Sequence, residues 1–232
     1  MEDDKKNSLI QFKASELDIK YPVNDKLIKK EKEKIQNSIK KGGVVTPEGR
    51  CFIENTSVQT QLCTDKKGVD RFYVDLDNND KFQDGKKRYS SVSSITKEIN
   101  ERIQQPRDAL THEKLRHSEE CLKAFRDEPT LVERRLIEES RIRKELPSLT
   151  EKKIKSEKID KCQLTGEDFS GDAEGHHVVR KADDPRKACD LENIVVVKGK
   201  VHDVIHCENA ESPEELEELC KNKGWKNPYS KK

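Results

Sequence analysis

The first helix-like pattern in the chain begins near residue 25. Residues 1–24 are polar with a few apolar positions, and we expect a loosely ordered arm. Residues 25–41 carry apolar side chains at helical spacing, and Asn24 or Asp25 can cap the helix. Its apolar face would comprise Leu27, Ile28, Ile35 and Ile39. The many lysines of this segment favour a solvated helix face, with contact to phosphates as the alternative.

Between residues 44 and 85 the apolar positions alternate over short runs. Alternation through Phe52, Val58 and Leu62, and again over residues 69–76, predicts a small antiparallel sheet. The Asp/Asn run that follows lacks the spaced glycine and final glutamate of an EF-hand loop, so it predicts a turn and not a calcium site. Residues 84–94 are polar and are expected to form a loop.

Residues 94–147 have helical periodicity interrupted by prolines. Three helices are expected, ending near Pro106, Pro129 and Pro147. Their thin apolar stripes are typical of a helical hairpin or arm, or of a short coiled-coil contact with a partner chain. His112 and His117 are expected at the surface of the middle helix.

The pattern from residue 148 to the C-terminus predicts a separate compact module. A helix over 148–160 precedes a short strand, a loop containing Asp-Pro, a second strand NIVVV and another helix. A last helix would begin at Ser212, a candidate cap, followed by Pro213. The whole chain is therefore expected to be α+β, with parts at 1–93, 94–147 and 148–232.

Composition favours polar helices, and we expect a cytoplasmic protein unless a dedicated system exports it. Hydrophobic residues make up 31% of the chain and charged residues 40%, which limits the size of any single core. The seven cysteines are odd in number and form no CxxC pair, so reduced thiols are expected. Cys162, Cys189, Cys207 and Cys220 are interpreted as small core residues, with a structural zinc site as the alternative. No signal peptide and no run long enough to span a membrane are visible, and we expect no membrane partner.

Four of the six histidines fall within residues 174–206. His202 and His206 are four residues apart, which places both on one face of a helix. His176 and His177 are adjacent in a predicted strand, so their side chains point to opposite faces. We therefore hypothesise three metal ligands and one free imidazole that acts as a base.

The order of these elements resembles the HNH, or ββα-metal, endonuclease family, and most closely the nuclease domain of the DNase colicins and pyocins. The resemblance covers about residues 162–208. It rests on the EGHH run at 174–177, on Asn193 at the start of the second strand, and on the spacing of His202 and His206. A ββα-metal module with one divalent ion (Mg, Mn, Ni or Zn) is what this resemblance implies.

The resemblance also implies a role for each motif residue. His176, His202 and His206 would bind the metal, and His177 would be the general base, for which an ordinary imidazole pKa near 6.5 is suitable. Asn193 would tie its side chain to the first strand or loop and so keep His177 oriented. Glu174 would orient one of the ligand imidazoles.

The expected substrate is double-stranded DNA. Six basic residues near the histidines are placed to contact its backbone. These are Arg180, Lys181, Arg186, Lys187, Lys198 and Lys200. Residues 151–232 nevertheless carry 16 Lys/Arg against 18 Asp/Glu, so part of the grip on DNA is expected from the N-terminal part or from a partner.

The sequence thus predicts a metal-dependent DNA endonuclease from a phage, a defence system or a toxin. The alternative is a non-catalytic nucleic-acid-binding or assembly protein whose module keeps the metal for stability. A toxin would require an immunity partner. The helical arm leaves homo-oligomerisation open.

Overall fold

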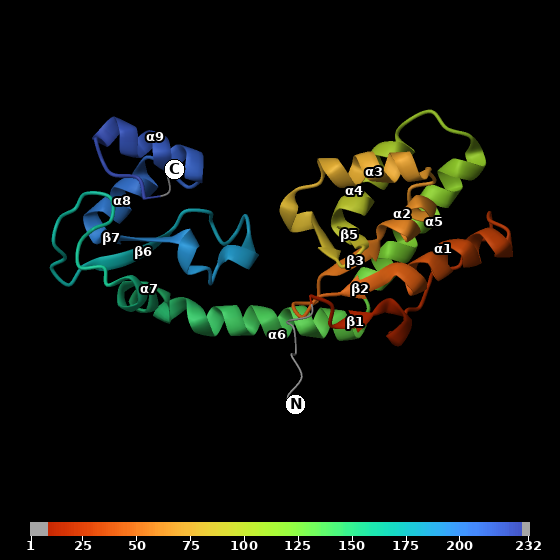
Figure 1. Ribbon diagram of the computed structural model, residues 1–232, viewed down its shortest axis with the longest axis horizontal. Helices are drawn as coiled ribbons and strands as arrows, with labels where there is room; N and C mark the ends of the chain where they lie inside the picture. Colours follow the sequence, from red (N-terminus) through yellow and green to blue (C-terminus); the bar gives the residue numbers. More distant parts are fainter. Residues whose placement is uncertain (1–8, 229–232) are drawn as a thin grey trace. The chain divides into compact units, whose positions relative to one another are not determined.

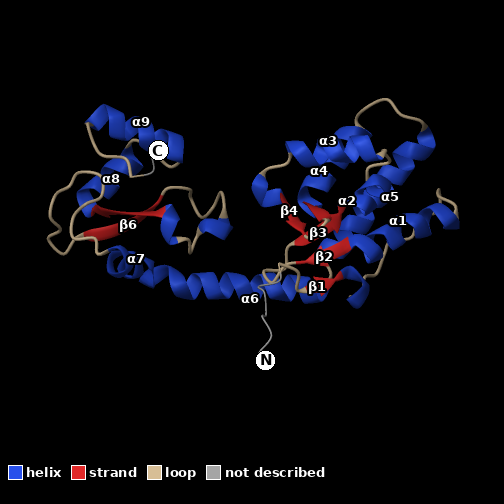
Figure 2. Cartoon of the chain, in the orientation of Figure 1, coloured by secondary structure: helices blue, strands red, loops and turns tan. Residues whose placement is uncertain are grey.

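The computed structural model describes residues 9–228, a mixture of helices and antiparallel strands (Figures 1 and 2). The first eight residues of the expected N-terminal arm lie outside the described residues. The chain divides into an N-terminal unit, Met1–Glu138, and a C-terminal unit, Glu139–Lys232. Helix α6 (Pro129–Glu145) contains the boundary. No helix in the described range is long and apolar enough to cross a membrane.

The N-terminal unit is built on a five-stranded antiparallel sheet in the order β1-β2-β3-β5-β4. The strands are β1 (Phe12–Lys13), β2 (Gly43–Val45), β3 (Cys51–Glu54), β4 (Lys81–Asp84) and β5 (Lys87–Ser91). The central pairing is symmetric about Ile53 and Ser90. Each of the two central strands has its hairpin partner on the outer side and leads directly into a helix. Two strand–strand–helix segments therefore repeat around the middle of the sheet.

Helices bury one face of this sheet. They are α1 (Lys29–Gly42), α2 (Asn55–Gln61), α3 (Lys66–Asp75), α4 (Val92–Ile103) and α5 (Ala109–Arg126), with short 3-10 turns at Ala14–Glu16 and Asn78–Asp80. Val45 and Ile53 of the sheet pack with Ile39, Ile99 and Phe125 in one apolar core.

The expected arm at residues 94–147 is not a separate part up to residue 138, because α4, α5 and Leu131 of α6 supply core residues of the N-terminal unit. The surface prediction for His117 is also wrong. Its side chain is fully buried in α5 beside Cys121, whereas His112 is half-buried. The thin apolar stripe of α5 is sufficient for burial because α1 and α2 also pack against this helix.

Two expected strands are helices. The segment containing Val58 and Leu62 forms α2, and residues 66–75 form α3. An i, i+4 spacing such as that of Val58 and Leu62 fits a helix as well as a strand, so short apolar runs are ambiguous. Asp65 decides the second case, because its side chain accepts a hydrogen bond from the backbone N–H of Gly68 at 2.8 Å and caps α3.

Boundaries in the first half also differ from the expectation. The first helix begins at Lys29 with Ile28 at the N-cap position, and neither Asn24 nor Asp25 caps it. The segment expected as a loop contains β5, and the β4–β5 hairpin turns at Gly85 with a positive φ of 58°. The Asp84–Gly85 pair is a hairpin signal that favoured this turn.

The C-terminal unit has the expected order of elements. Helix α7 (Leu149–Glu157) precedes the antiparallel pair β6 (Ala173–His177) and β7 (Ile194–Lys198), which is followed by α8 (Gly199–Cys207) and α9 (Pro213–Lys223). Short 3-10 turns lie at Leu146–Ser148, Pro185–Lys187 and Leu191–Asn193. Ser212 caps α9 as predicted, accepting from the Glu215 N–H at 3.2 Å. Val195, Val197, Ile205 and Leu216 form the centre of the core.

Candidate metal centre

Strand β6 and helix α8 bring three histidines together in the C-terminal unit. One nitrogen each from His176, His202 and His206 lies within 4.8 Å of the others. Among the described residues this is the only group of three or more His, Cys, Asp or Glu side chains with such an arrangement. β7 leads directly into α8, which places the first turns of the helix beside β6 (Figure 1). The four-residue spacing of His202 and His206 on α8 then brings both of their rings close to the ring of His176 on β6.

His176 is the buried member of this cluster. Its side chain is 3% exposed, and its Nε2 atom has no hydrogen-bond partner among residues 9–228. Burial, and then the neighbouring rings of His202 and His206, lower the pKa of His176 from 6.5 to about 4. The ring is therefore neutral at pH 7. A buried imidazole nitrogen without a partner is costly unless something binds it, and a metal ion is what a neutral imidazole binds best.

Two carboxylates hold the other two rings. The Nδ1 atom of His202 lies 2.6 Å from Glu174 Oε2, and the Nδ1 atom of His206 lies 3.3 Å from Glu211 Oε1. A proton held on Nδ1 leaves Nε2 as the metal-binding atom of each ring. The two Nε2 atoms are 3.2 Å apart. A tetrahedral ion with metal–nitrogen distances of about 2.0–2.1 Å would separate two ligands by about 3.3 Å, so this pair fits an ion.

Glu211 is a site residue that the sequence analysis did not identify. After α8 the chain reverses at Asn209, which has a positive φ of 53°. The N–H of Ala210 donates to the carbonyl of Ile205 at 3.0 Å and closes the turn. This turn brings the Glu211 carboxylate back to His206. Hydrogen bonds from Arg180 and then from His206 lower the pKa of Glu211 below its usual range.

His177 lies on the other side of β6, as strand alternation requires. It is half-buried, and its Nε2 atom lies 2.9 Å from the backbone carbonyl of Ala188. Since a carbonyl can only accept, Nε2 carries the proton and Nδ1 has a free lone pair. The geometry therefore leaves Nδ1 of His177 as a proton acceptor outside the three-histidine cluster.

Asn193 fastens the loop that carries Ala188. Its buried side chain accepts from the Val179 N–H at 2.8 Å and donates to the carbonyls of Val179 at 2.9 Å and Lys187 at 3.2 Å. Lys187 is the neighbour of Ala188, whose carbonyl contacts His177. Asn193 is thus linked to His177 through the loop backbone and does not join the histidine cluster. Its role in catalysis stays a prediction.

Three of the six basic residues expected at DNA are engaged within the protein. Arg180 pairs with Glu211 and Asp183, Arg186 with Asp184, and Lys198 with Glu167. Lys181, Lys187 and Lys200 form no ion pair within residues 9–228. The first three are paired because acidic residues of the same unit lie beside them. Contact of all six with nucleic acid stays a prediction.

The cysteines of the C-terminal unit occupy different environments. Cys162 and Cys220 are buried in its core and Cys189 is half-buried, but Cys207 is exposed, so its expected place in the core is wrong. Cys207 follows the exposed His206 at the C-terminal end of α8 and is itself exposed in the described structure.

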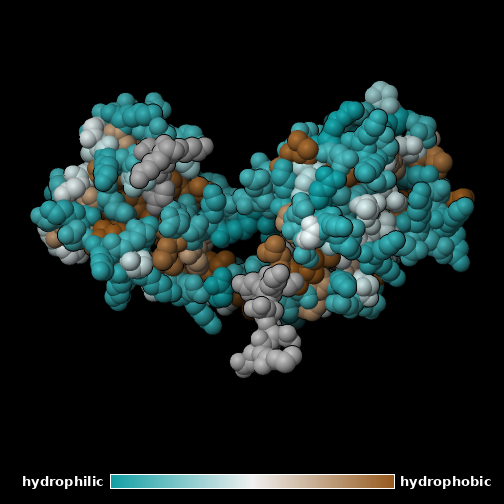
Figure 3. Space-filling model, viewed as in Figure 1, coloured by the Kyte–Doolittle hydropathy of each residue, from teal (hydrophilic) through white to brown (hydrophobic). Residues whose placement is uncertain are grey.

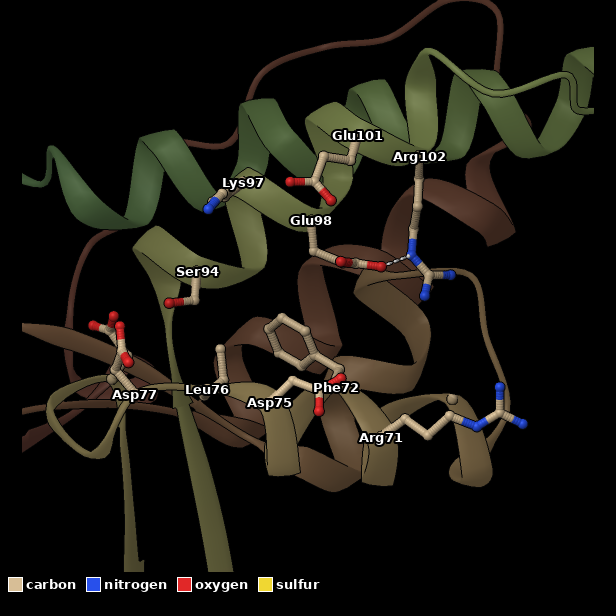
Figure 4. A pocket seen from close by; sticks show the side chains of 12 residues that line it. Arg71, Phe72, Asp75, Leu76, Asp77, Ser94, Lys97, Glu98, Glu101 and Arg102 are labelled. Carbon is tan, nitrogen blue, oxygen red and sulfur yellow. Dashed lines mark hydrogen bonds and ion pairs between the residues drawn. The ribbon is translucent and has the colours of Figure 1, made fainter.

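A pocket of about 420 Å³ lies between α3 and α4 in the N-terminal unit (Figure 4). Phe72 and Leu76 contribute its apolar side chains, and Glu98 pairs with Arg102 at its rim at 2.6 Å. Its lining includes five carboxylates and three cations, and among the described residues it contains no group of side chains placed to hold a metal ion. The histidine cluster therefore remains the candidate site.

The chain matches no protein-family model, no curated protein and no solved structure. The geometry of the cluster and the motif spacing thus carry the functional argument.

Proposed function

We propose that the protein is a metal-dependent endonuclease that hydrolyses phosphodiester bonds of double-stranded DNA. The observation that carries this proposal is the pairing of a three-histidine cluster with a separate, oriented imidazole, His177. Its support is the resemblance of residues 162–208 to HNH nucleases together with this arrangement in the C-terminal unit.

His176, His202 and His206 would hold one divalent ion. When bound, that ion would stabilise the negative charge that develops on the scissile phosphate and the leaving oxygen. The unpartnered Nε2 of buried His176 supports this fit. Three imidazoles favour Zn or Ni over Mg, because Mg prefers oxygen ligands. Of the four metals expected, we therefore propose the transition metals as the tighter-binding ones.

His177 would accept the proton of the attacking water at Nδ1. The Ala188 carbonyl at 2.9 Å holds the opposite nitrogen protonated and keeps the ring from rotating. When Nδ1 takes the proton, the imidazolium that forms is stabilised by the same carbonyl. Asn193 would act as a positioning residue through the loop that presents this carbonyl.

Glu174 would orient His202, because its carboxylate lies 2.6 Å from the His202 Nδ1 atom. This contact places Glu174 beside a ligand ring and leaves no argument for it as the proton acceptor. Mutation of His177 therefore tests the base, and mutation of Glu174 tests the orienting carboxylate.

The test is cleavage of supercoiled plasmid by the full chain with Mg²⁺, Mn²⁺, Ni²⁺ or Zn²⁺. We expect nicking by the wild type and a loss of about 10²-fold or more in His177→Ala, with metal binding retained. His112→Ala, a half-buried histidine of α5, is the matched control and should cut like the wild type. A wild type that cuts neither DNA nor RNA with any of these metals would instead support the non-catalytic binding or assembly protein.

A further inference from the structure

The C-terminal unit is poorly equipped to hold a polyanion by itself. Residues 139–232 carry 19 basic against 20 acidic residues, and Arg180, Arg186 and Lys198 are paired with carboxylates. Affinity for DNA depends mainly on unpaired cations near phosphates. If the proposed function holds, another surface of the chain should supply that charge.

Helix α1, the orange-red helix of Figure 1, presents such a surface. Lys30, Lys34 and Lys41 are exposed and, with Asn37, recur at intervals of four, three and four residues. At 3.6 residues per turn these four side chains fall within an arc of about 60° and extend over about 16 Å. In the described part of the chain none of the three lysines forms an ion pair. Figure 3 shows a mainly hydrophilic surface at this end of the N-terminal unit.

The carboxylates of α1 form their ion pairs with lysines outside this stripe. Glu31 pairs with Lys114 of α5 at 2.9 Å, and Glu33 pairs with Lys29 at 3.7 Å. The charge of Glu31 also acts on Lys34 and Lys30, but among the described residues neither acid forms an ion pair with a stripe lysine.

The opposite face of α1 fixes the helix on the protein. Ile35 and Ile39 are buried in the core, and the side chain of Gln61 donates to the Ile35 carbonyl at 3.1 Å. The lysine stripe therefore lies on a helix that is packed against the core. The same burial removes the apolar face that an amphipathic helix would need to enter a membrane surface.

This arrangement is unfavourable for the helix itself. Lys30 and Lys34 are like charges at i, i+4, and Lys30 lies in the first turn, where the helix dipole disfavours a cation. Departures from local preference without a compensating contact are expected at functional surfaces. Binding of an anion along the stripe would remove the repulsion.

We propose that Lys30, Lys34, Asn37 and Lys41 form a contact surface for the sugar-phosphate backbone of double-stranded DNA. Duplex DNA carries one charge per about 1.7 Å of its axis, so a 16 Å stripe faces several phosphates at once. Lysines and one amide contact phosphates without reading bases, and the surface would bind independently of sequence.

The experiment measures binding of a 30-base-pair duplex to the full-length chain in EDTA, over a range of salt concentrations. The variant is Lys30→Gln/Lys34→Gln/Lys41→Gln. The matched control is Lys66→Gln/Lys67→Gln/Lys86→Gln, which removes three exposed lysines of the same unit that form no ion pair within residues 9–228. Circular dichroism checks that all three proteins are folded.

We expect the stripe variant to bind at least about tenfold more weakly at low salt. Its slope of log K against log salt should fall by about 2.7, because each phosphate contact contributes about 0.9. The control should keep the wild-type slope. Equal slopes for the stripe variant and the wild type, or equal losses in both variants, would overturn the inference, as would tighter binding of a structured RNA than of the duplex.

Since EDTA prevents metal-dependent cleavage, binding is scored apart from catalysis. A stripe variant that binds and cuts like the wild type removes this inference and leaves the proposed function standing. A wild type that binds through the stripe but never cuts removes the proposed function and leaves this inference standing.

Discussion

The turn after α8 makes one prediction that separates a designed metal site from a chance cluster of histidines. Glu211→Ala removes the carboxylate that lies 3.3 Å from Nδ1 of His206. Without it, the His206 ring can rotate and can place its proton on Nε2, the nitrogen that faces His202. We expect a weaker metal site and an unchanged fold, because Glu211 is not part of the core.

The magnitude follows from the two carboxylate contacts. Partners of this kind typically contribute 10- to 100-fold to metal affinity. The Glu211 contact, at 3.3 Å, is longer than the 2.6 Å contact of Glu174 with His202. We therefore expect a loss of about 10-fold for Glu211→Ala and a loss closer to 100-fold for Glu174→Ala. Glu211→Gln retains an oxygen acceptor and should lose less than Glu211→Ala.

The assay is competition for Zn²⁺ with a chromophoric chelator at pH 7.5. Glu208→Ala is the matched control, since Glu208 lies in the same turn but pairs with Lys223 at 3.2 Å and not with a histidine. Long-range ¹H–¹⁵N spectra of the metal-free protein provide a second readout. They should show the proton of His206 on Nδ1 in the wild type and a mixture of tautomers in Glu211→Ala. Equal zinc affinity in Glu211→Ala, Glu208→Ala and the wild type, with the tautomer unchanged, would refute the reasoning.

Three further perturbations test the rest of the structure. Asn193→Ala leaves partly buried backbone groups of Val179 without these partners and should lower the free energy of unfolding by about 1–3 kcal/mol in urea titrations, a loss that an exposed-site substitution would not match. In Gly175→Ala the added Cβ would overlap Thr150 Oγ1 of α7, so zinc affinity should fall, and adding Thr150→Ala should restore it; failure of the double variant to recover would place the cause elsewhere. The pKa of His117 is lowered by burial, so the unfolded chain takes up its proton first as the pH falls below about 6.5, and stability should fall from pH 7.5 to 5.5. Urea unfolding should show a smaller fall in His117→Leu, and an equal fall in both proteins would contradict this assignment.

The parts of the fold that the sequence could predict are those with long or locally determined patterns. The prediction of the final helix is confirmed, because Ser212 and Pro213 mark its start independently of any tertiary contact. The segments now forming α2 and α3 were mistaken for strands because runs of five to eight residues with few apolar positions fit both periods. Whether α4 and α5 belong to a core or to an arm depends on which elements pack against them. The periodicity of apolar residues does not identify those elements.

The histidine cluster shows the same limit within the site itself. Ring separation on β6 and ring alignment on α8 follow from strand and helix geometry, so spacing alone predicts that only one of His176 and His177 joins His202 and His206. That His176 is the one that joins them was implied by the resemblance to HNH nucleases. Glu211 was not, because it belongs to an acid-rich segment and reaches His206 only through the left-handed turn at Asn209. Gly175 carries information of the same kind, since the need for glycine arises where α7 packs against β6. Residues that bind can be inferred from local periodicity, whereas residues that orient them are selected by turns and close packing, and for these the three-dimensional structure is required.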